Sequence, residues 1–313
     1  MTSMSSQFGL FPDELFLQII DAAVSMFLIK DRTTVVRLCQ TSKAVYNHIA
    51  PTLYHTIIIT GENAEDIEEF AIDADTALLA ARIFSHTRTL HEIARVGNFP
   101  TDFLQNVESI HASFHLIRDI AVVADRVDAN AGIPLSSPSS CSIRRIHMRH
   151  ARLRSVSQIP VRTRANFTHF CGQVSTSTAK RHHAAFVNDP EAYMRGILDA
   201  LPALIHLGLE ISYVNILSSH VVNNWEIGAF ERALRTALSY RRLTVIAIRV
   251  SGRFIQRWDE IICVLRHVSG STRRLLVWKD DSRVTSWNEE EFRARDAAEG
   301  RSIWTEARPV QDI

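Results

Sequence analysis

Short apolar runs alternate with amphipathic stretches along most of this chain. Several stretches of five to eight residues contain two or more valine, isoleucine, leucine or phenylalanine side chains and are β-like. The amphipathic stretches between them predict helices. The predicted strands cover residues 55–60, 89–96, 107–112, 143–148, 167–171, 204–211, 243–250 and 274–278, and the predicted helices cover 64–84, 114–127, 190–201, 226–240, 254–268 and 288–299.

The segment before the first predicted strand has helical patterns only. Pro12 suits the first turn of a helix, where its missing N–H costs nothing, and Asp13 and Glu14 suit the positive end of the helix dipole. The apolar residues that follow, as far as Phe27, cover more than one face, so we expect this helix to contact neighbours on two sides. Two shorter helices are predicted after it, one over residues 35–40 and one from Thr41 or Ser42 to about Ala50.

The alternation of strands and helices favours a parallel sheet with right-handed crossovers. Residues 204–209 and 243–248 have the leucine-rich character of irregular leucine-rich repeats, although no regular repeat register is present. We therefore expect an α/β chain, in which a small all-α unit precedes an irregular β/α solenoid of leucine-rich-repeat character. A compact, doubly wound parallel sheet is the alternative. The tail from Lys279 to Ile313 is expected to cap the open end of the repeat array.

The composition of the 313 residues, 46% hydrophobic and 22% charged, is that of an ordinary globular protein. This excludes a largely disordered or fibrous chain. Cys39, Cys141, Cys171 and Cys263 are scattered and form no CxxC pair, so neither a disulfide framework nor a zinc motif is expected. Free thiols favour a reducing compartment, and no apolar run reaches the ~20 residues of a membrane helix. We expect a cytoplasmic or nuclear protein without a membrane partner.

Charge is unevenly distributed along the chain. Residues 1–140 carry 9 Lys and Arg against 17 Asp and Glu, and the remainder carries 26 against 17, which gives net charges of −8 and +9. Residues 141–183, here called the basic segment, contain nine bases, five histidines and no acid. This segment is either a solvated surface or a docking surface for an acidic partner. It contains no RNA-binding or finger pattern, so nucleic acid is not expected as a partner.

No motif in the sequence predicts catalysis. His91-Glu92-Ile93-Ala94-Arg95 resembles the HExxH zinc motif but has arginine in place of the second histidine. His182-His183 are adjacent and are interpreted as surface histidines, and Asp280-Asp281 as a turn after a strand. Nucleophile-elbow, phosphate-loop, dinucleotide-binding and kinase signatures are all missing from the sequence. We therefore expect no catalytic residue, no metal site, no cofactor and no enzymatic activity.

Three sequence pieces before residue 58 share the order and spacing of a known domain. The pieces are Phe11-Pro12-x-Glu14-Leu15-x-x-x-Ile19-Ile20, then Leu38-Cys39-x-Thr41-Ser42-Lys43-x-Val45-Tyr46, and finally Ala50-Pro51-x-Leu53-Tyr54-His55-Thr56-Ile57. They resemble the F-box, in particular that of the F-box-like proteins abundant in fungi. The resemblance implies a disordered tail over residues 1–8, an F-box-like domain over 9–56 and a degenerate leucine-rich-repeat-like region over 57–313.

The resemblance implies a role in protein assembly. F-box proteins bind the Skp-family adaptor of cullin–RING ubiquitin ligases, and such a chain is a substrate receptor that holds a target protein with its C-terminal region. A domain this small has little core of its own, which leaves apolar side chains available to a partner. The residues expected to contact the adaptor are Phe11, Pro12, Leu15, Ile19, Leu38 and Val45, although Ile19, Leu38 and Val45 can equally pack internally.

The target is expected to contact the basic segment. Strand alternation predicts that Arg145 and Arg149 share one face and that Arg144 lies on the other. The residues assigned to an acidic target are Arg145, Arg149, Arg152 and Arg154, with Arg144, Arg162 and Arg164 nearby. One alternative is an F-box-containing scaffold that acts outside ubiquitination. Another is an unrecognised hydrolase or nucleic-acid binder.

Overall fold

The computed structural model describes residues 13–27, 32–73, 75–93, 104, 106–132, 142–149, 156–173, 189–211, 227–281 and 289–313. At the N-terminal end three helices form a helical unit (residues 13–53) with a small core of its own, which includes Ile20, Val24, Val35 and Ile49. Ser42 caps the third helix, because its Oγ accepts a hydrogen bond of 3.1 Å from the Val45 N–H. The helices are α1 (Asp13–Phe27), α2 (Arg32–Cys39) and α3 (Lys43–Leu53).

Helix α3 extends beyond its predicted end near Ala50. Pro51 lies inside the helix, where it removes a single backbone hydrogen bond. The turn nevertheless closes, since the Tyr54 N–H donates to the Ala50 carbonyl at 3.0 Å. Burial of Leu53 in the core of the helical unit favours this extra turn.

Nine strands of the described chain form one sheet, in which each strand lies beside its neighbour in sequence. The first eight strands are parallel, and β9 runs antiparallel to β8. A doubly wound sheet would reverse its strand order at a switch point, and the strand order here has no such reversal. The strands are β1 (Thr56–Ile59), β2 (Thr89–Glu92), β3 (Ser109–Ser113), β4 (Arg145–Arg149), β5 (His169–Gln173), β6 (His206–Ile211), β7 (Val245–Ser251), β8 (Leu275–Asp280) and β9 (Arg308–Pro309).

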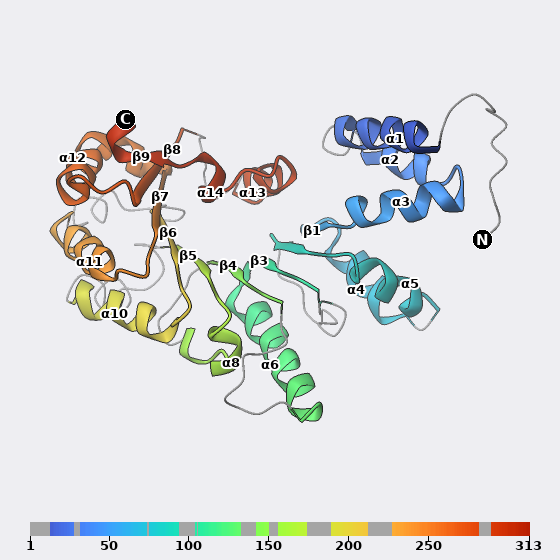
Figure 1. The fold of residues 1–313 in the computed structure, drawn as a ribbon, viewed down its shortest axis with the longest axis horizontal. Coiled ribbons are helices and arrows are strands. Elements are labelled where there is room, and N and C mark those ends of the chain that lie inside the picture. Colours follow the sequence, from blue (N-terminus) through green and yellow to red (C-terminus); the bar gives the residue numbers. More distant parts are fainter. Residues whose placement is uncertain are drawn as a thin grey trace.

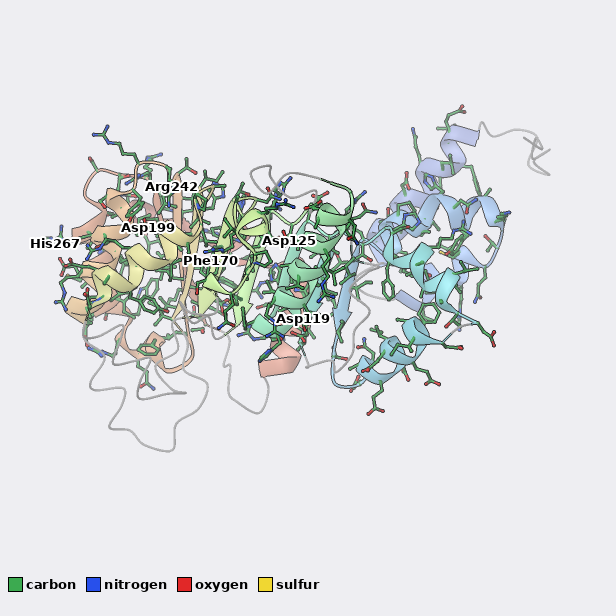
Figure 2. The ribbon with its side chains drawn as sticks, turned by 90° about the horizontal axis from the view of Figure 1, so that it is seen from below. Asp119, Asp125, Phe170, Asp199, Arg242 and His267 are labelled. Carbon is green, nitrogen blue, oxygen red and sulfur yellow. The ribbon has the colours of Figure 1, made fainter. Side chains whose placement is uncertain are left out.

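The strands follow an arc with a layer of helices along its outer side (Figure 1). Figure 2 views this layer, with Asp119 and Asp125 on α6 and Asp199 on α10. The outer layer consists of α4 (Ala64–Ile72), α5 (Ala77–Phe84), α6 (Phe114–Asn130), α8 (Val161–Arg164), α10 (Pro190–Ala200), α11 (Ile227–Ser239), the 3-10 helix η3 (Gly252–Arg257) and α12 (Trp258–Ser269).

The main hydrophobic core lies between the outer helices and the sheet. Alternate residues of a strand point to the same face, so side chains in register on neighbouring strands form rows across the sheet. The rows on the helix-covered face belong to this core. One such register row, buried from end to end, is Leu90, Ile110, Ile146, Phe170, Leu207 and Ile246.

Among the helices of the described residues, none is both long enough and apolar enough to span a bilayer.

The predicted acidic helix over residues 64–84 is two helices, α4 and α5. Asp73 ends α4, and its Oδ1 accepts a hydrogen bond of 3.1 Å from the Asp75 N–H. The Thr76 Oγ1 donates to the Phe70 carbonyl at 2.6 Å. These side-chain bonds compete with helical backbone bonds, which explains the break that the apolar pattern does not show.

The C-terminal tail has the expected place only in part. Its last segment does close the β8 end of the sheet, since β9 pairs with β8 and Val310 is part of the core. However, α13 (Glu289–Ala298) and α14 (Ile303–Glu306) lie inside the arc, on the side away from the outer helices (Figure 1). The tail therefore covers part of the inner face of the sheet as well as its end.

The helical unit is anchored to the sheet layer through α3 and α5. The Arg82 Nη2 donates a hydrogen bond of 2.9 Å to the Asn47 Oδ1, and the guanidinium lies 5.5 Å from the centre of the Tyr46 ring. The buried Thr87 donates to the Tyr54 carbonyl at 3.2 Å. These contacts leave the opposite helix, α1, at the outer end of the molecule (Figure 1).

Candidate functional site

Helix α1 presents a row of apolar side chains to solvent. Leu15, Ile19 and Met26 are 44%, 57% and 58% exposed. Their spacing of four and eleven residues places them on one face of the helix, opposite the buried Ile20 and Val24. Such a row on an element that already has a packed face is typical of a binding surface. We call Leu15, Ile19 and Met26 the α1 face.

The residues expected to contact an adaptor do not all lie on this face. Leu15 and Ile19 do, whereas Leu38 is half-buried and packs against the core of the helical unit. Val45 is only 4% exposed and is part of that core. Its packing is therefore internal, and its side chain stabilises α3. Phe11 and Pro12 lie outside the described residues. Phe16 and Val36 are exposed apolar residues of the helical unit that the sequence had not singled out.

The described arginines of the basic segment do not all lie on one surface. Arg145 lies on β4 with an exposed side chain, in register with His169 of β5. Arg149 is the last residue of the same strand, as expected, and nothing is described of its side chain. Arg144 is also exposed, and strand alternation directs it away from the face of Arg145. Arg152 and Arg154 lie outside the described residues.

Two arginines named with this surface belong to the outer helical layer instead. Arg162 lies in α8 and its side chain is only 5% exposed, 3.9 Å from Asp125 of α6. Arg164 is half-buried and donates to the Ala200 carbonyl at 3.4 Å. The cause is the short helix α8, which the sequence analysis did not predict. Arg162 is therefore a packing residue of the helical layer and does not contribute to a target surface.

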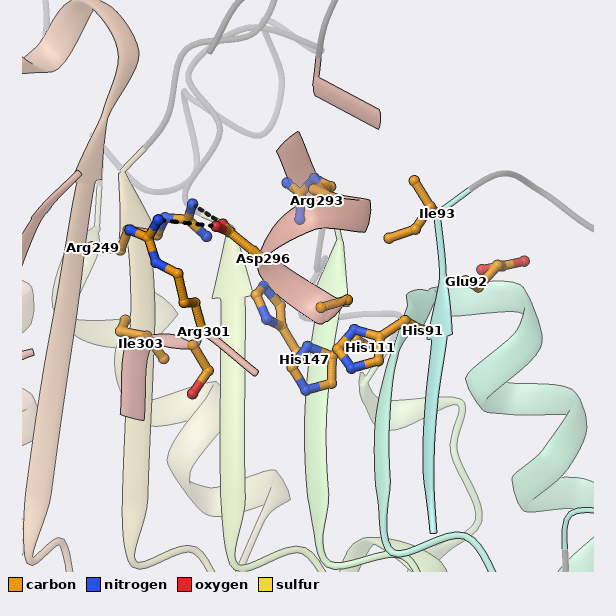
Figure 3. A pocket seen from close by; sticks show the side chains of 12 residues that line it. His91, Glu92, Ile93, His111, His147, Arg249, Arg293, Asp296, Arg301 and Ile303 are labelled. Carbon is orange, nitrogen blue, oxygen red and sulfur yellow. Dashed lines mark hydrogen bonds and ion pairs between the residues drawn. The ribbon is translucent and has the colours of Figure 1, made fainter. Parts of the chain in front are cut away.

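The inner face of the sheet carries a row of histidines that the sequence analysis did not connect. His91 of β2, His111 of β3 and His147 of β4 are direct register neighbours. The ring centres of His91 and His111 lie 4.2 Å apart, and those of His111 and His147 lie 5.0 Å apart. Figure 3 shows the three rings side by side beneath the tail. We call these residues the histidine row.

Burial favours neutral imidazole rings at two members of the histidine row, His91 and His111. Burial, reinforced by the charge of His147, lowers the pKa of His91 to about 4. Burial is also the main reason why the pKa of His111 lies well below its usual value. A cavity of about 40 Å³ adjoins these rings and extends to Arg293, Asp296 and Ile303 of the tail (Figure 3). It is large enough to hold a water molecule.

A buried network of charges joins the tail to the sheet. Arg249 of β7 donates to Glu210 of β6 at 3.1 Å, to Asp280 of β8 at 2.9 Å and to Asp296 of α13 at 2.8 Å. Its guanidinium also lies 4.1 Å from the centre of a Trp278 ring. Asp280 is thus the last residue of β8 and an ion-pair partner, and the interpretation of Asp280-Asp281 as a turn was wrong for Asp280.

The pKa values of the network follow from these contacts. Burial alone would raise the pKa of Glu210, but His147 and Arg249 outweigh it and hold the pKa well below its usual range. Burial alone would lower the pKa of Arg249, yet Glu210 and Asp280 reverse this and raise it. Burial raises the pKa of Asp296 despite Arg249. The network therefore contains an ionised arginine between carboxylates at neutral pH.

Trp304 of α14 covers the inner face farther along the sheet. Its ring centre lies 5.5 Å from that of His169 and 5.9 Å from that of His206. His169 and His206 in turn share a hydrogen bond of 2.6 Å between ring nitrogens. Gly208 leaves the space that Trp304 and Cys171 occupy, since a Cβ at this position would lie 2.8 Å from the Cys171 Sγ. Aromatic packing therefore fixes α14 on the sheet.

One group within the described residues has the donor atoms of a metal site. His147, Cys171 and Glu210 place a ring nitrogen, a sulfur and a carboxylate oxygen within 4.8 Å of one another. The three residues come from adjacent strands, β4, β5 and β6. They are far apart in sequence and fit no ligand spacing, so only the strand register reveals that they meet.

Comparisons with protein-family models, with curated proteins and with solved structures find no match for this chain.

Proposed function

We propose that this protein is a substrate receptor of an SCF-type cullin–RING ubiquitin ligase, in which the helical unit binds a Skp-family adaptor and the sheet region binds a target protein. The observation that carries the proposal is the α1 face. Exposed apolar area costs roughly 25 cal/mol per Å², and a partner that covers it recovers this free energy. The F-box-like sequence pieces of this same unit indicate which kind of partner it is.

The arrangement of the remaining chain supports a binding role for it. Strands that follow sequence order, with helices along one side, support an irregular leucine-rich-repeat-like solenoid over residues 57–313. Solenoids present extended surfaces on which side chains of successive strands lie in rows. A receptor of this kind performs no chemistry itself, because it promotes transfer by holding the target near the catalytic subunit.

The proposed target surface is centred on Arg145. Its exposed guanidinium lies on β4 next to His169, on the inner face that the tail covers only in part. We assign Arg149, Arg152 and Arg154 to the same surface from their places in the basic segment. Arginines recognise carboxylate and phosphate groups by paired hydrogen bonds. The target is therefore an acidic or phosphorylated protein.

Co-purification of the full chain with a Skp-family adaptor tests the proposal. The double variant Leu15→Ala/Ile19→Ala removes two side chains of the α1 face, and we expect binding to weaken ~10-fold or more. The matched control is Leu78→Ala/Leu79→Ala, which removes two exposed leucines from α5, 88% and 47% exposed. The proposal fails if the native, folded chain does not retain the adaptor, or if both double variants lose it equally.

The alternative, a scaffold that acts outside ubiquitination, is separated by a second measurement on the same complex. A substrate receptor recruits the cullin through the adaptor. A complex of the chain with the adaptor that excludes the cullin would favour the scaffold.

A further inference from the structure

The geometry points to a zinc site on the inner face of the sheet: we propose that His147, Cys171 and Glu210 bind one Zn²⁺ ion. The strand register brings the three residues together. His147 and Cys171 are direct partners on β4 and β5. Glu210 of β6 lies opposite Gln173, two residues beyond Cys171, and so points to the same face of the sheet.

The donor atoms are enclosed and close enough to share an ion. The His147 and Glu210 side chains are 11% and 3% exposed, and Cys171 is fully buried. The His147 Nε2 lies 3.2 Å from the Glu210 Oε2, and all three donor atoms lie within 4.8 Å of one another. Zinc bonds of about 2.0–2.3 Å in a tetrahedral arrangement separate ligand atoms by ~3.5 Å. Small side-chain movements thus suffice to complete the site.

A buried ring nitrogen aimed at this place supports the assignment. The His147 Nε2 is shielded from solvent, and it faces the Glu210 Oε2 at 3.2 Å, one of the other two proposed ligand atoms. Buried polar atoms in proteins are held by polar partners, and here the nitrogen and the carboxylate are directed at each other. A metal ion between His147, Cys171 and Glu210 would use this nitrogen as a ligand.

Arg249 and Arg293 lie 3.1 Å and 3.9 Å from the Glu210 carboxylate, so a divalent cation at this place needs the negative charge of both Glu210 and a Cys171 thiolate. Glu210 and the Cys171 thiolate supply two negative charges, and the thiol proton leaves to water when the ion binds. Arg249 retains two other carboxylates, Asp280 at 2.9 Å and Asp296 at 2.8 Å. Glu210 can therefore turn towards the ion without leaving Arg249 unpaired.

The mixture of donor types selects the metal. Calcium and magnesium prefer oxygen ligands, whereas a thiolate, an imidazole and a carboxylate together favour zinc. Three protein ligands leave a fourth position on the ion. The cavity of about 40 Å³ that His147 lines has room for a water molecule on the histidine side of the site.

The first test is a titration of the purified full chain, freed of metal by a chelator, with Co²⁺. We expect one Co²⁺ per chain with a thiolate-to-cobalt charge-transfer band, and displacement of that ion by one equivalent of Zn²⁺. Cys171→Ser removes the band, whereas Cys39→Ser, also buried, and Cys263→Ser, on the surface of α12, retain it. Glu210→Gln weakens Zn²⁺ binding ~100-fold or more, because loss of an outer-shell partner alone costs 10–100-fold.

A second measurement on the native chain avoids any dependence on how the variants fold. X-ray absorption of the zinc-loaded protein is expected to show one sulfur at about 2.3 Å together with nitrogen and oxygen ligands. A folded native chain that takes up no Co²⁺, or that binds zinc with nitrogen and oxygen ligands only, overturns the proposal. Retention of the charge-transfer band in Cys171→Ser overturns it as well.

Discussion

Single residues on the inner face show how small side chains make room for large ones. Gly208 faces the Cys171 Sγ and the Trp304 ring, which a Cβ would approach to 2.8 Å and 3.2 Å. Close packing of this kind transmits strain, because protein interiors contain few voids that can absorb an added methyl group. The glycine is thus as much a part of the packing of α14 as Trp304 is.

Gly208→Ala is therefore expected to lower the free energy of unfolding by ~1–3 kcal/mol, as overpacked cores do. Gly228→Ala is the matched control, since its Cβ would meet nothing closer than the Arg232 Nη1 at 3.7 Å, on a surface of α11. Alanine in a helix is neutral or stabilising by up to ~1 kcal/mol relative to glycine. Urea unfolding of the two variants measures the difference, and equal effects would contradict this account of the packing.

The histidine row predicts a dependence of stability on pH. The pKa of His91 is about 4 in the folded chain against 6.5 as its ordinary value, because burial favours the neutral ring. Its stabilising contribution is complete above pH 6.5 and is lost as the pH falls through about 4. The other charged and titratable groups that line the same cavity are Glu92, His111, His147, Arg249, Arg293, Asp296 and Arg301.

We expect the native chain to lose roughly 2–3 kcal/mol more unfolding free energy between pH 7 and pH 4 than His91→Gln does. The comparison of native chain and variant removes the contribution of the carboxylates, which titrate in both. Urea titrations at a series of pH values supply the two curves. Parallel curves would show that His91 is as easily protonated in the folded chain as in the unfolded one.

At the scale of elements, the eight parallel strands were easier to predict than the short helices and the helix breaks between them. All eight parallel strands overlap the short β-like stretches that predicted them, since burial against the outer helices places apolar residues in each stretch. The short helices α8 and α14 and the two-residue strand β9 were missed, because so few residues carry no periodicity. The break between α4 and α5 was missed because it depends on side-chain hydrogen bonds of Asp73 and Thr76.

The sites were harder to predict than the elements. Two residues of the α1 face, Leu15 and Ile19, were named through the F-box resemblance, and Met26 was not. His147, Cys171 and Glu210 could not be, since their proximity depends on the register of three strands joined by long connections. Val45 and Arg162 are the opposite case. Both were named as candidate contact residues, and both are buried and pack inside the protein.

The inner helix α13 is expected to depend on Arg249, whose three carboxylate partners come from β6, β8 and α13. Arg249→Met leaves buried carboxylates unpaired, so we expect it to lower the free energy of unfolding by about 3–5 kcal/mol. Arg235→Met is the control, since Arg235 is 51% exposed and pairs with Glu231 on the surface of α11. Its loss should cost no more than about 1 kcal/mol. Denaturant unfolding checks both values, and a similar cost for the two variants would contradict the structural role of the network.

In the whole molecule, the α1 face and the inner side of the sheet are two separate surfaces. Helix α1 lies at one end of the molecule, and α13 and α14 lie along the inner side of the sheet (Figure 1). The strand register places the histidine row and Arg145 on this same inner side. A partner bound at the α1 face therefore leaves the inner side open to a second protein. This separation is what a receptor that joins an adaptor to a target requires.

The central claim is that α1 holds a Skp-family adaptor. Amide hydrogen exchange of the full chain, measured with and without the adaptor, tests both the binding and its place. The account predicts slower exchange over α1, Asp13–Phe27, and unchanged exchange in strands β6–β8. No change anywhere in a folded chain, or protection confined to the sheet, would contradict it.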